Sequence, residues 1–186
     1  MFTTPKFTVK INTTKIAEEK FRQLLTENAV EYKEMPVAGA LEIIHRGSIT
    51  AIPGFKEGYF YVQGVTSQYA VSATEIREGY DVLDLCAAPG GKSFAAAIAL
   101  DNTGTVTSCD PNPPRLKLIE DGAARLGLTN ITTVQNSGEV YNANLKKYDV
   151  IICDVPCSGI GIIPKKPDLR YKSMADVKQL AQLQYN

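Results

Sequence analysis

The alternation of apolar and polar residues separates the chain into two parts. In the first part, a run that alternates residue by residue is followed by an amphipathic segment and by three short runs rich in β-forming residues. The pattern predicts strands over residues 7–12, 30–34, 41–49 and 59–62, and a helix from Lys15 to about Glu27 with Thr13 or Thr14 as its cap. This order predicts a small α+β domain over residues 1–65, similar in outline to an RNA-recognition-type sheet. Because the segment lacks the aromatic pair with which such modules stack bases, a packing role is the alternative to RNA contact.

From residue 66 onward, apolar strand-like runs alternate with helical segments. The pattern predicts strands ending at Cys86 and over residues 105–110, 131–135 and 148–154, and helices over residues 67–77, 92–100, 113–126 and 174–185. Strands that alternate with helices imply right-handed crossovers and a parallel sheet. A doubly wound sheet usually continues with further strands, so residues 66–186 are expected to hold the first half of a Rossmann-like α/β sheet. The strand over residues 148–154 would then lie at an exposed edge.

The stretch from Asp81 to Ser93 connects an apolar run to a helix through the small-residue turn Cys86-Ala87-Ala88-Pro89-Gly90-Gly91-Lys92. Small residues let the backbone approach a ligand closely, and a helix N-terminus offers free N–H groups to polar or anionic groups. In an open α/β sheet, a nucleotide-like ligand lies in this crevice. Asp110 ends the next strand about twenty residues later, a spacing that suits a carboxylate bound to a ribose hydroxyl pair. A helix-capping role is the alternative for Asp110.

A phosphate-binding loop of a nucleotide hydrolase is the rival interpretation of the same turn. Residues 86–93 nearly match that motif, and the apolar strand before Asp154 resembles the acidic strand that assists magnesium. However, Cys86 replaces the first glycine, and Pro89 removes a backbone donor inside the cradle. These two departures disfavour a phosphate loop.

A second group of chemically active residues follows the strand over residues 148–154. Asp154, Pro156, Cys157 and Gly159 lie together where a doubly wound sheet has its active site. A thiolate is intrinsically reactive, so Cys157 is a candidate nucleophile. An inert, buried thiol is the alternative.

Composition narrows the class of protein. Basic and acidic residues balance at 20 each, but a local excess of basic residues after Pro164 includes Lys165, Lys166 and Arg170, which can contact RNA phosphates. A solvated polar segment is the alternative. No apolar run approaches the roughly 20 residues of a membrane span, and the N-terminus lacks the pattern of a signal peptide. Three of the four cysteines close apolar strand-like runs, which suits reduced, buried thiols in a cytoplasmic protein better than a disulfide framework. Cys153 and Cys157 alone are too few for a zinc site, and the single His45 is far away in sequence.

Together these motifs resemble the Sun/Nop-type RNA cytosine methyltransferases, which use S-adenosyl-L-methionine to make 5-methylcytosine. The resemblance is carried by residues 84–92, by Asp110 with Arg115-Leu116, by residues 154–159 with Gly161, and by residues 166–170 and 180–184. Residues 5–12, 55–63 and 67–68 also match, so the resemblance covers nearly the whole chain. The bacterial ribosomal-RNA members are the nearest match. Ribosomal RNA is therefore expected as the substrate ahead of transfer RNA, without a membrane or a metal as partner.

The resemblance implies a class I methyltransferase fold and assigns roles to the site residues. Residues 86–92 would surround the methionine and ribose parts of the cofactor, Asp110 would bind the ribose hydroxyls, and Asp154 would lie near the methyl group and the target base. The family commonly has an acid after the third strand, near the adenine. Here Asn136 or Ser137 would take its place.

The thiol chemistry follows from the same resemblance. Cytosine carbon 5 is a poor nucleophile until a thiolate adds to carbon 6, and the base must be unpaired or flipped out. The family uses two cysteines: the one that matches Cys157 helps to release the product, and the nucleophile lies on a later strand, beyond residue 186. DNA cytosine methyltransferases use a Pro-Cys thiol as the nucleophile, so both roles stay open for Cys157. We expect this chain to bind cofactor but to turn over poorly or not at all. A non-catalytic cofactor- or RNA-binding module is the alternative.

Overall fold

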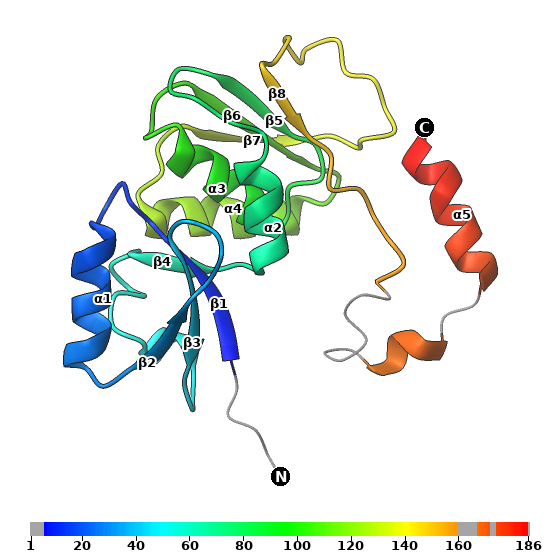
Figure 1. Cartoon of the computed structure of the whole chain (residues 1–186). Coiled ribbons are helices and arrows are strands. Elements are labelled where there is room, and N and C mark those ends of the chain that lie inside the picture. Colours follow the sequence, from blue (N-terminus) through cyan, green and yellow to red (C-terminus); the bar gives the residue numbers. More distant parts are fainter. Residues whose placement is uncertain (1–5, 160–166, 172–173, 186) are drawn as a thin grey trace.

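The computed structural model describes residues 6–159, 167–171 and 174–185, and contains two four-stranded sheets (Figure 1). The first sheet is antiparallel, with the order β2-β3-β1-β4. Its strands are β1 (Lys6–Ile11), β2 (Glu31–Glu34), β3 (Ala40–Ile44) and β4 (Phe60–Val62), and a 3-10 turn, η1, covers Ile49–Ala51. One face packs on helix α1 (Glu18–Glu27), and together they bury an apolar core of Val9, Ile11, Phe21, Leu25, Leu41, Ile43 and Phe60.

Helix α1 begins three residues later than predicted, and neither threonine caps it. Its N-cap is Ala17, which provides no side-chain hydrogen bond. The Thr14 hydroxyl instead donates to Asn12 Oδ1 at 2.7 Å, and the N–H groups of Lys15 and Ile16 donate to the Asn12 carbonyl. A turn at Asn12 therefore uses the Thr14 hydroxyl that would have capped a helix beginning at Lys15.

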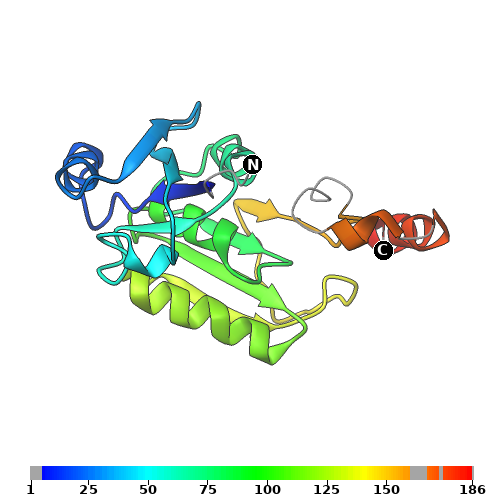
Figure 2. The same cartoon turned by 90° about the horizontal axis from the view of Figure 1, so that it is seen from below.

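The second sheet is parallel, with the order β7-β6-β5-β8, as the alternating pattern predicts. Its strands are β5 (Asp81–Asp84), β6 (Thr105–Asp110), β7 (Ile131–Gln135) and β8 (Val150–Ile152). Helices α2 (Val65–Ser72), α3 (Gly91–Ala99) and α4 (Pro113–Leu126) contribute to its apolar core. In Figures 1 and 2, α3 and α4 lie on one face of the parallel sheet, between that sheet and the first one. Helix α5 (Met174–Tyr185) and the 3-10 turn η3 (Pro167–Tyr171) stand to one side.

Two elements of this second part are shorter than predicted. Helix α2 ends at Ser72 rather than Arg77, because Glu75 takes a positive φ of 51° that no helix continues through. Strand β8 pairs with β5 over only three residues and forms an edge of the sheet, as expected. Ile151 on this strand is 56% exposed.

The C-terminus of helix α4 is held by side chains from the first part of the chain. Asn12 Nδ2 donates to the carbonyls of Gly58 at 2.9 Å and Leu126 at 2.8 Å. In return, Arg125 Nη1 donates to the carbonyls of Phe55 and Phe60, and its guanidinium lies 4.2 Å from the centre of the Phe55 ring. The bond to Leu126 satisfies a helix-end carbonyl, and together these bonds fix α4, whose other end lies at the site described below. Among the described helices, none is long and apolar enough to cross a membrane.

Candidate functional site

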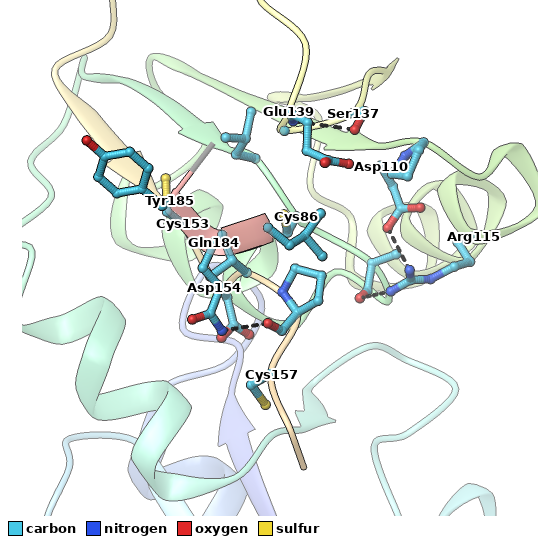
Figure 3. A pocket seen from close by; sticks show the side chains of 17 residues that line it. Cys86, Asp110, Arg115, Ser137, Glu139, Cys153, Asp154, Cys157, Gln184 and Tyr185 are labelled. Carbon is cyan, nitrogen blue, oxygen red and sulfur yellow. Dashed lines mark hydrogen bonds and ion pairs between the residues drawn. The ribbon is translucent and has the colours of Figure 1, made fainter. Parts of the chain in front are cut away.

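The carboxyl ends of the four parallel strands surround a cavity of about 650 Å³ (Figure 3). Residues that follow β5, β6, β7 and β8 all contribute to its wall, and the C-terminal end of α5 closes one side. The wall includes Leu85, Cys86, Ala88, Asp110, Pro111, Arg115, Ser137, Gly138, Glu139, Cys153, Asp154, Val155, Pro156, Cys157, Leu183, Gln184 and Tyr185. Because this edge is where open α/β sheets bind ligands, the cavity is the candidate site.

The small-residue turn after β5 is held tightly by backbone hydrogen bonds. Ala87 N–H donates to the Cys109 carbonyl at 2.8 Å, and Gly90 N–H donates to the Ala87 carbonyl at 2.7 Å. Gly90 has a φ of +107°, and a Cβ there would lie 2.5 Å from the Phe94 ring, so only glycine fits. Of the predicted turn residues, Cys86 and Ala88 line the cavity, whereas Ala87 and Gly90 are buried and Pro89 is exposed.

Asp110 is almost fully buried at the end of β6, with its carboxylate partly engaged. Its Oδ1 accepts from Asn112 N–H at 3.0 Å, and its Oδ2 lies 3.2 Å from Arg115 Nη1. Arg115 also donates through Nη2 to the Ala88 carbonyl at 2.8 Å, so one guanidinium connects the acid to the turn. Each carboxylate oxygen has two lone pairs, which leaves acceptor capacity for a pair of hydroxyl groups.

A buried polar cluster lies beneath the turn. Asp84 is fully buried, and its Oδ2 accepts from Ser93 Oγ at 2.7 Å, which in turn accepts from Ser108 Oγ at 2.8 Å. Its Oδ1 has no partner among the described residues. Burial raises the pKa of Asp84 to about 6, against the lowering effect of the Ser93 hydrogen bond and the Lys92 charge.

Lys92 and Asp154 form an ion pair between the large cavity and a smaller one. Asp154 lines both the large cavity and a smaller one of about 260 Å³, and Lys92 lines the smaller one beside Val71 and Ile151. An acid from β8 is thereby tied to the first turn of α3, and it is accessible from both sides.

Three thiols, those of Cys86, Cys153 and Cys157, line the large cavity. All four cysteines of the chain are free, as expected. The prediction of a buried thiol is confirmed for Cys109, whereas Cys86 is half-buried and the prediction is wrong for Cys153, which is exposed, as is Cys157. Burial, followed by the charge of Asp84, raises the pKa of both Cys86 and Cys153. Neither of these two thiols is therefore activated as a thiolate here.

The residues predicted near the adenine separate into two groups. Ser137 lines the cavity, whereas the Asn136 amide is used within its own loop: Nδ2 donates to the Ser137 carbonyl, and Oδ1 accepts from Asn142. Of the predicted RNA contacts, Lys165 and Lys166 lie outside the described residues. Arg170 is exposed on η3, away from the cavity wall, with its guanidinium 5.8 Å from the Tyr171 ring.

Some parts of the cavity wall received no role from the sequence. Glu139 reaches the cavity from the loop after β7, and Gln184 of α5 donates to the Pro156 carbonyl at 2.7 Å (Figure 3). Arg115 had a usable signal, because it lies in the first turn of the helix that follows the strand-end acid. The position of α5 depends on contacts remote in sequence, so no local pattern reports it. Among the described residues, no group of three or more candidate ligands forms a metal site.

Comparisons with known proteins agree with this geometry. The chain is similar to a probable ribosomal RNA small subunit methyltransferase B of Bacillus subtilis, with 34% identity over 97% of this chain and 41% of the relative. It is also similar to a tRNA (cytosine(72)-C(5))-methyltransferase of Pyrococcus horikoshii, with 34% identity over 73% of this chain and 37% of that protein. A crystal structure of a methyltransferase homologue from Pyrococcus horikoshii superposes with a TM-score of 0.80 at 29% identity, over 95% of this chain and 56% of that one.

The chain spans only about two fifths of the length of these two curated relatives. The comparisons favour neither a phosphate-loop hydrolase nor a non-catalytic module. The family described as 16S rRNA methyltransferase RsmB/F matches residues 71–186, which include the turn, Asp110 and the Asp154–Cys157 segment. The chain therefore belongs to the RsmB/F family of 16S rRNA methyltransferases.

Proposed function

We propose that this chain carries the S-adenosyl-L-methionine site of an enzyme that methylates carbon 5 of cytosine in RNA, with ribosomal RNA as the substrate. The observation that carries the proposal is the cavity at the carboxyl edge, where a buried acid with spare acceptor capacity faces a glycine turn. The names of the relatives, which refer to ribosomal and transfer RNA, support RNA as the partner.

The cavity fits the nucleoside part of the cofactor. Asp110 offers the remaining lone pairs of its carboxylate to the two ribose hydroxyls, and Arg115 holds that carboxylate in place from the side. Ser137 and the apolar Leu85 and Pro111 form the wall beyond it, where a flat, polar-edged base would lie. Bound there, the cofactor supplies an electrophilic methyl group on a sulfonium.

Asp154 is placed where the two substrates of such a reaction would meet. It lines the cofactor cavity on one side and the smaller hollow on the other, and Lys92 holds its carboxylate. The apolar side chains of Val71 and Ile151 suit the faces of a pyrimidine that has been flipped out of its stack. The Asp154 carboxylate would then accept a hydrogen bond from the target base.

Cys157 follows Asp154 by three residues and lies exposed in the same cavity. We assign it to product release, with the nucleophilic thiol supplied by a part of the enzyme outside this chain. A nucleophilic Cys157 is the alternative assignment, and it makes a different prediction. If this chain alone methylates unmodified ribosomal RNA and Cys157→Ala abolishes that turnover, the two-cysteine assignment is wrong.

Isothermal titration with S-adenosylhomocysteine tests the cofactor site directly. We expect the wild-type chain to bind with one-to-one stoichiometry and Asp110→Ala to weaken binding by at least about tenfold, because it loses charge-assisted hydrogen bonds to both hydroxyls. Asp121→Ala is the matched control, since Asp121 is an exposed acid on α4 that pairs with Lys117 of the same helix. Equal affinities for the two variants would contradict the proposed role of Asp110.

A further inference from the structure

The end of strand β4, in the first sheet, packs directly on the glycine turn of the second part. Gln63 follows β4 and is only 7% exposed. Its side chain lies over Gly91: a Cβ built on that glycine would be 3.4 Å from Gln63 Nε2 and 3.7 Å from Gln63 Cδ and Cγ. A residue that is remote from the cavity wall thus contacts the turn that shapes it.

Tyr61, on the same strand, makes a second connection to the turn. Its hydroxyl donates to Gln63 Oε1 at 3.0 Å, and burial raises the pKa of Tyr61, which keeps this donor protonated. Its ring meets Phe94 edge to face, with centroids 5.6 Å apart. The Phe94 ring in turn fills the space beside Gly90 that a side chain would need. Both glycines of the turn are therefore supported from β4, one by Gln63 and the other through Tyr61 and Phe94.

The backbone of Gln63 is fixed by a hydrogen bond from Gln68, whereas its side-chain amide uses only its oxygen, which accepts from Tyr61. Gln68 Nε2 donates to the Gln63 carbonyl at 2.9 Å and to the Val9 carbonyl at 3.1 Å, which connects α2, β1 and the end of β4. Gln63 Nε2 has no partner among the described residues. A buried, unpaired donor is unfavourable, so the contacts of the rest of the side chain must hold it against Gly91.

We propose that Gln63 is a positioning residue for cofactor binding: from the first sheet, it holds the Gly90–Gly91 turn in the conformation that binds S-adenosylmethionine. The inference rests on the proposed function and extends it, because it makes cofactor affinity depend on a part of the chain that does not line the cavity. Only a few contacts connect the Gly90–Gly91 turn to Asp110. Ala88 lines the cavity and accepts from Arg115 two residues before Gly90, so a displaced turn also displaces the partner of the guanidinium that holds Asp110.

The test compares two Gln63 variants and one control in the 186-residue chain. Gln63→Ala removes the contact with Gly91, whereas Gln63→Met keeps a side chain of the same length over it. Ile43→Val is the control, because it destabilises the core of the first sheet at a residue that contacts neither the turn nor α4. The two readouts are affinity for S-adenosylhomocysteine by isothermal titration and, without ligand, amide hydrogen exchange over residues 86–93.

We expect Gln63→Ala to weaken binding about tenfold, equivalent to about 1.4 kcal/mol, and to speed up exchange over residues 86–93. Gln63→Met should bind within a few-fold of the wild type, and Ile43→Val should keep its affinity despite a lower unfolding midpoint. Wild-type affinity and exchange in Gln63→Ala would overturn the proposal, as would an equal loss of affinity in Ile43→Val. If the wild-type chain does not bind the ligand, the proposed function fails. The exchange of the ligand-free variants then still decides whether Gln63 holds the turn.

Discussion

The buried carboxyl group of Asp84 should make folding stability depend on pH in a direction opposite to that of an ordinary surface acid. Its pKa in the folded chain is about 6, against an ordinary value of 3.8, and desolvation is the largest cause. A group whose folded pKa is raised favours the folded state when protonated. Its contribution is therefore most favourable at low pH, and stability is lost as the pH rises from about 4 to about 6. The nearby charges act in opposite directions, since Lys92 lowers this pKa and Asp154 raises it.

The magnitude follows from the two pKa values. Their difference corresponds to about 3 kcal/mol in total, of which about 1.3 kcal/mol falls between pH 5 and pH 7. Asp84→Asn removes the titration and adds a pH-independent offset, because its amide takes the place of the unpartnered Oδ1. The free energy of unfolding of the wild type, minus that of the variant, should thus fall by about 1.3 kcal/mol over this range.

Urea unfolding, followed by circular dichroism at several pH values from 5 to 7, measures this difference. The slope of free energy against urea should be the same for both proteins, so that the comparison concerns stability alone. Parallel pH profiles would show that Asp84 does not titrate near 6. A gap that widens in favour of the wild type as the pH rises would show that the acid is stabilised as a carboxylate, which refutes the reasoning from burial.

Three further predictions concern neighbouring groups. Asn12→Ala should lower the free energy of unfolding by about 2–4 kcal/mol, because it leaves two buried carbonyls unpaired. The control, Asn144→Ala at an exposed residue, should change the free energy of unfolding by less than about 0.5 kcal/mol. Urea titration measures both values. Gly90→Ala should destabilise by more than Gly79→Ala, since both need a positive φ but only Gly90 also faces the Phe94 ring; thermal unfolding would contradict this if the two midpoints matched. Lys92→Met should move the pH dependence assigned to Asp84 to higher pH, because the cation that lowers its pKa is lost; an unmoved profile would exclude that coupling.

The bounds of several elements of the parallel sheet could be predicted from the sequence, because the residues that set these bounds lie within or next to each element. Residues 105–110, 113–126 and 131–135 form strand, helix and strand at the predicted bounds. Pro113 and Pro114 fix the start of α4, and Gly127, with a φ of +69°, ends it. Where a long-range contact competes with a local capping residue, the observed bounds of the helix or strand differ from the predicted bounds. The Asn12 side chain accepts a hydrogen bond from Thr14, one of the two predicted caps of α1, and donates a hydrogen bond to the Leu126 carbonyl.

The candidate site also combines residues that local sequence predicts with contacts that depend on the folded chain. The turn, Asp110 and Asp154 are recognisable because spacing along a strand–helix unit determines where they lie. The pairing of Lys92 with Asp154, 62 residues apart, comes only from the register of β5 beside β8. The contact of Gln63 with Gly91 comes from the packing of one sheet against the helices of the other, and no pattern in either segment reports it. These long-range contacts are also where the structure adds most to the functional account.

A competition between two ligands tests the central claim most directly. The account predicts that the chain binds S-adenosylhomocysteine in a titration, and that ATP with magnesium produces no heat and does not displace it, because Cys86 and Pro89 replace the features of a phosphate loop. Binding of ATP in place of S-adenosylhomocysteine, or binding of neither ligand, would contradict the assignment of this cavity as an S-adenosylmethionine site.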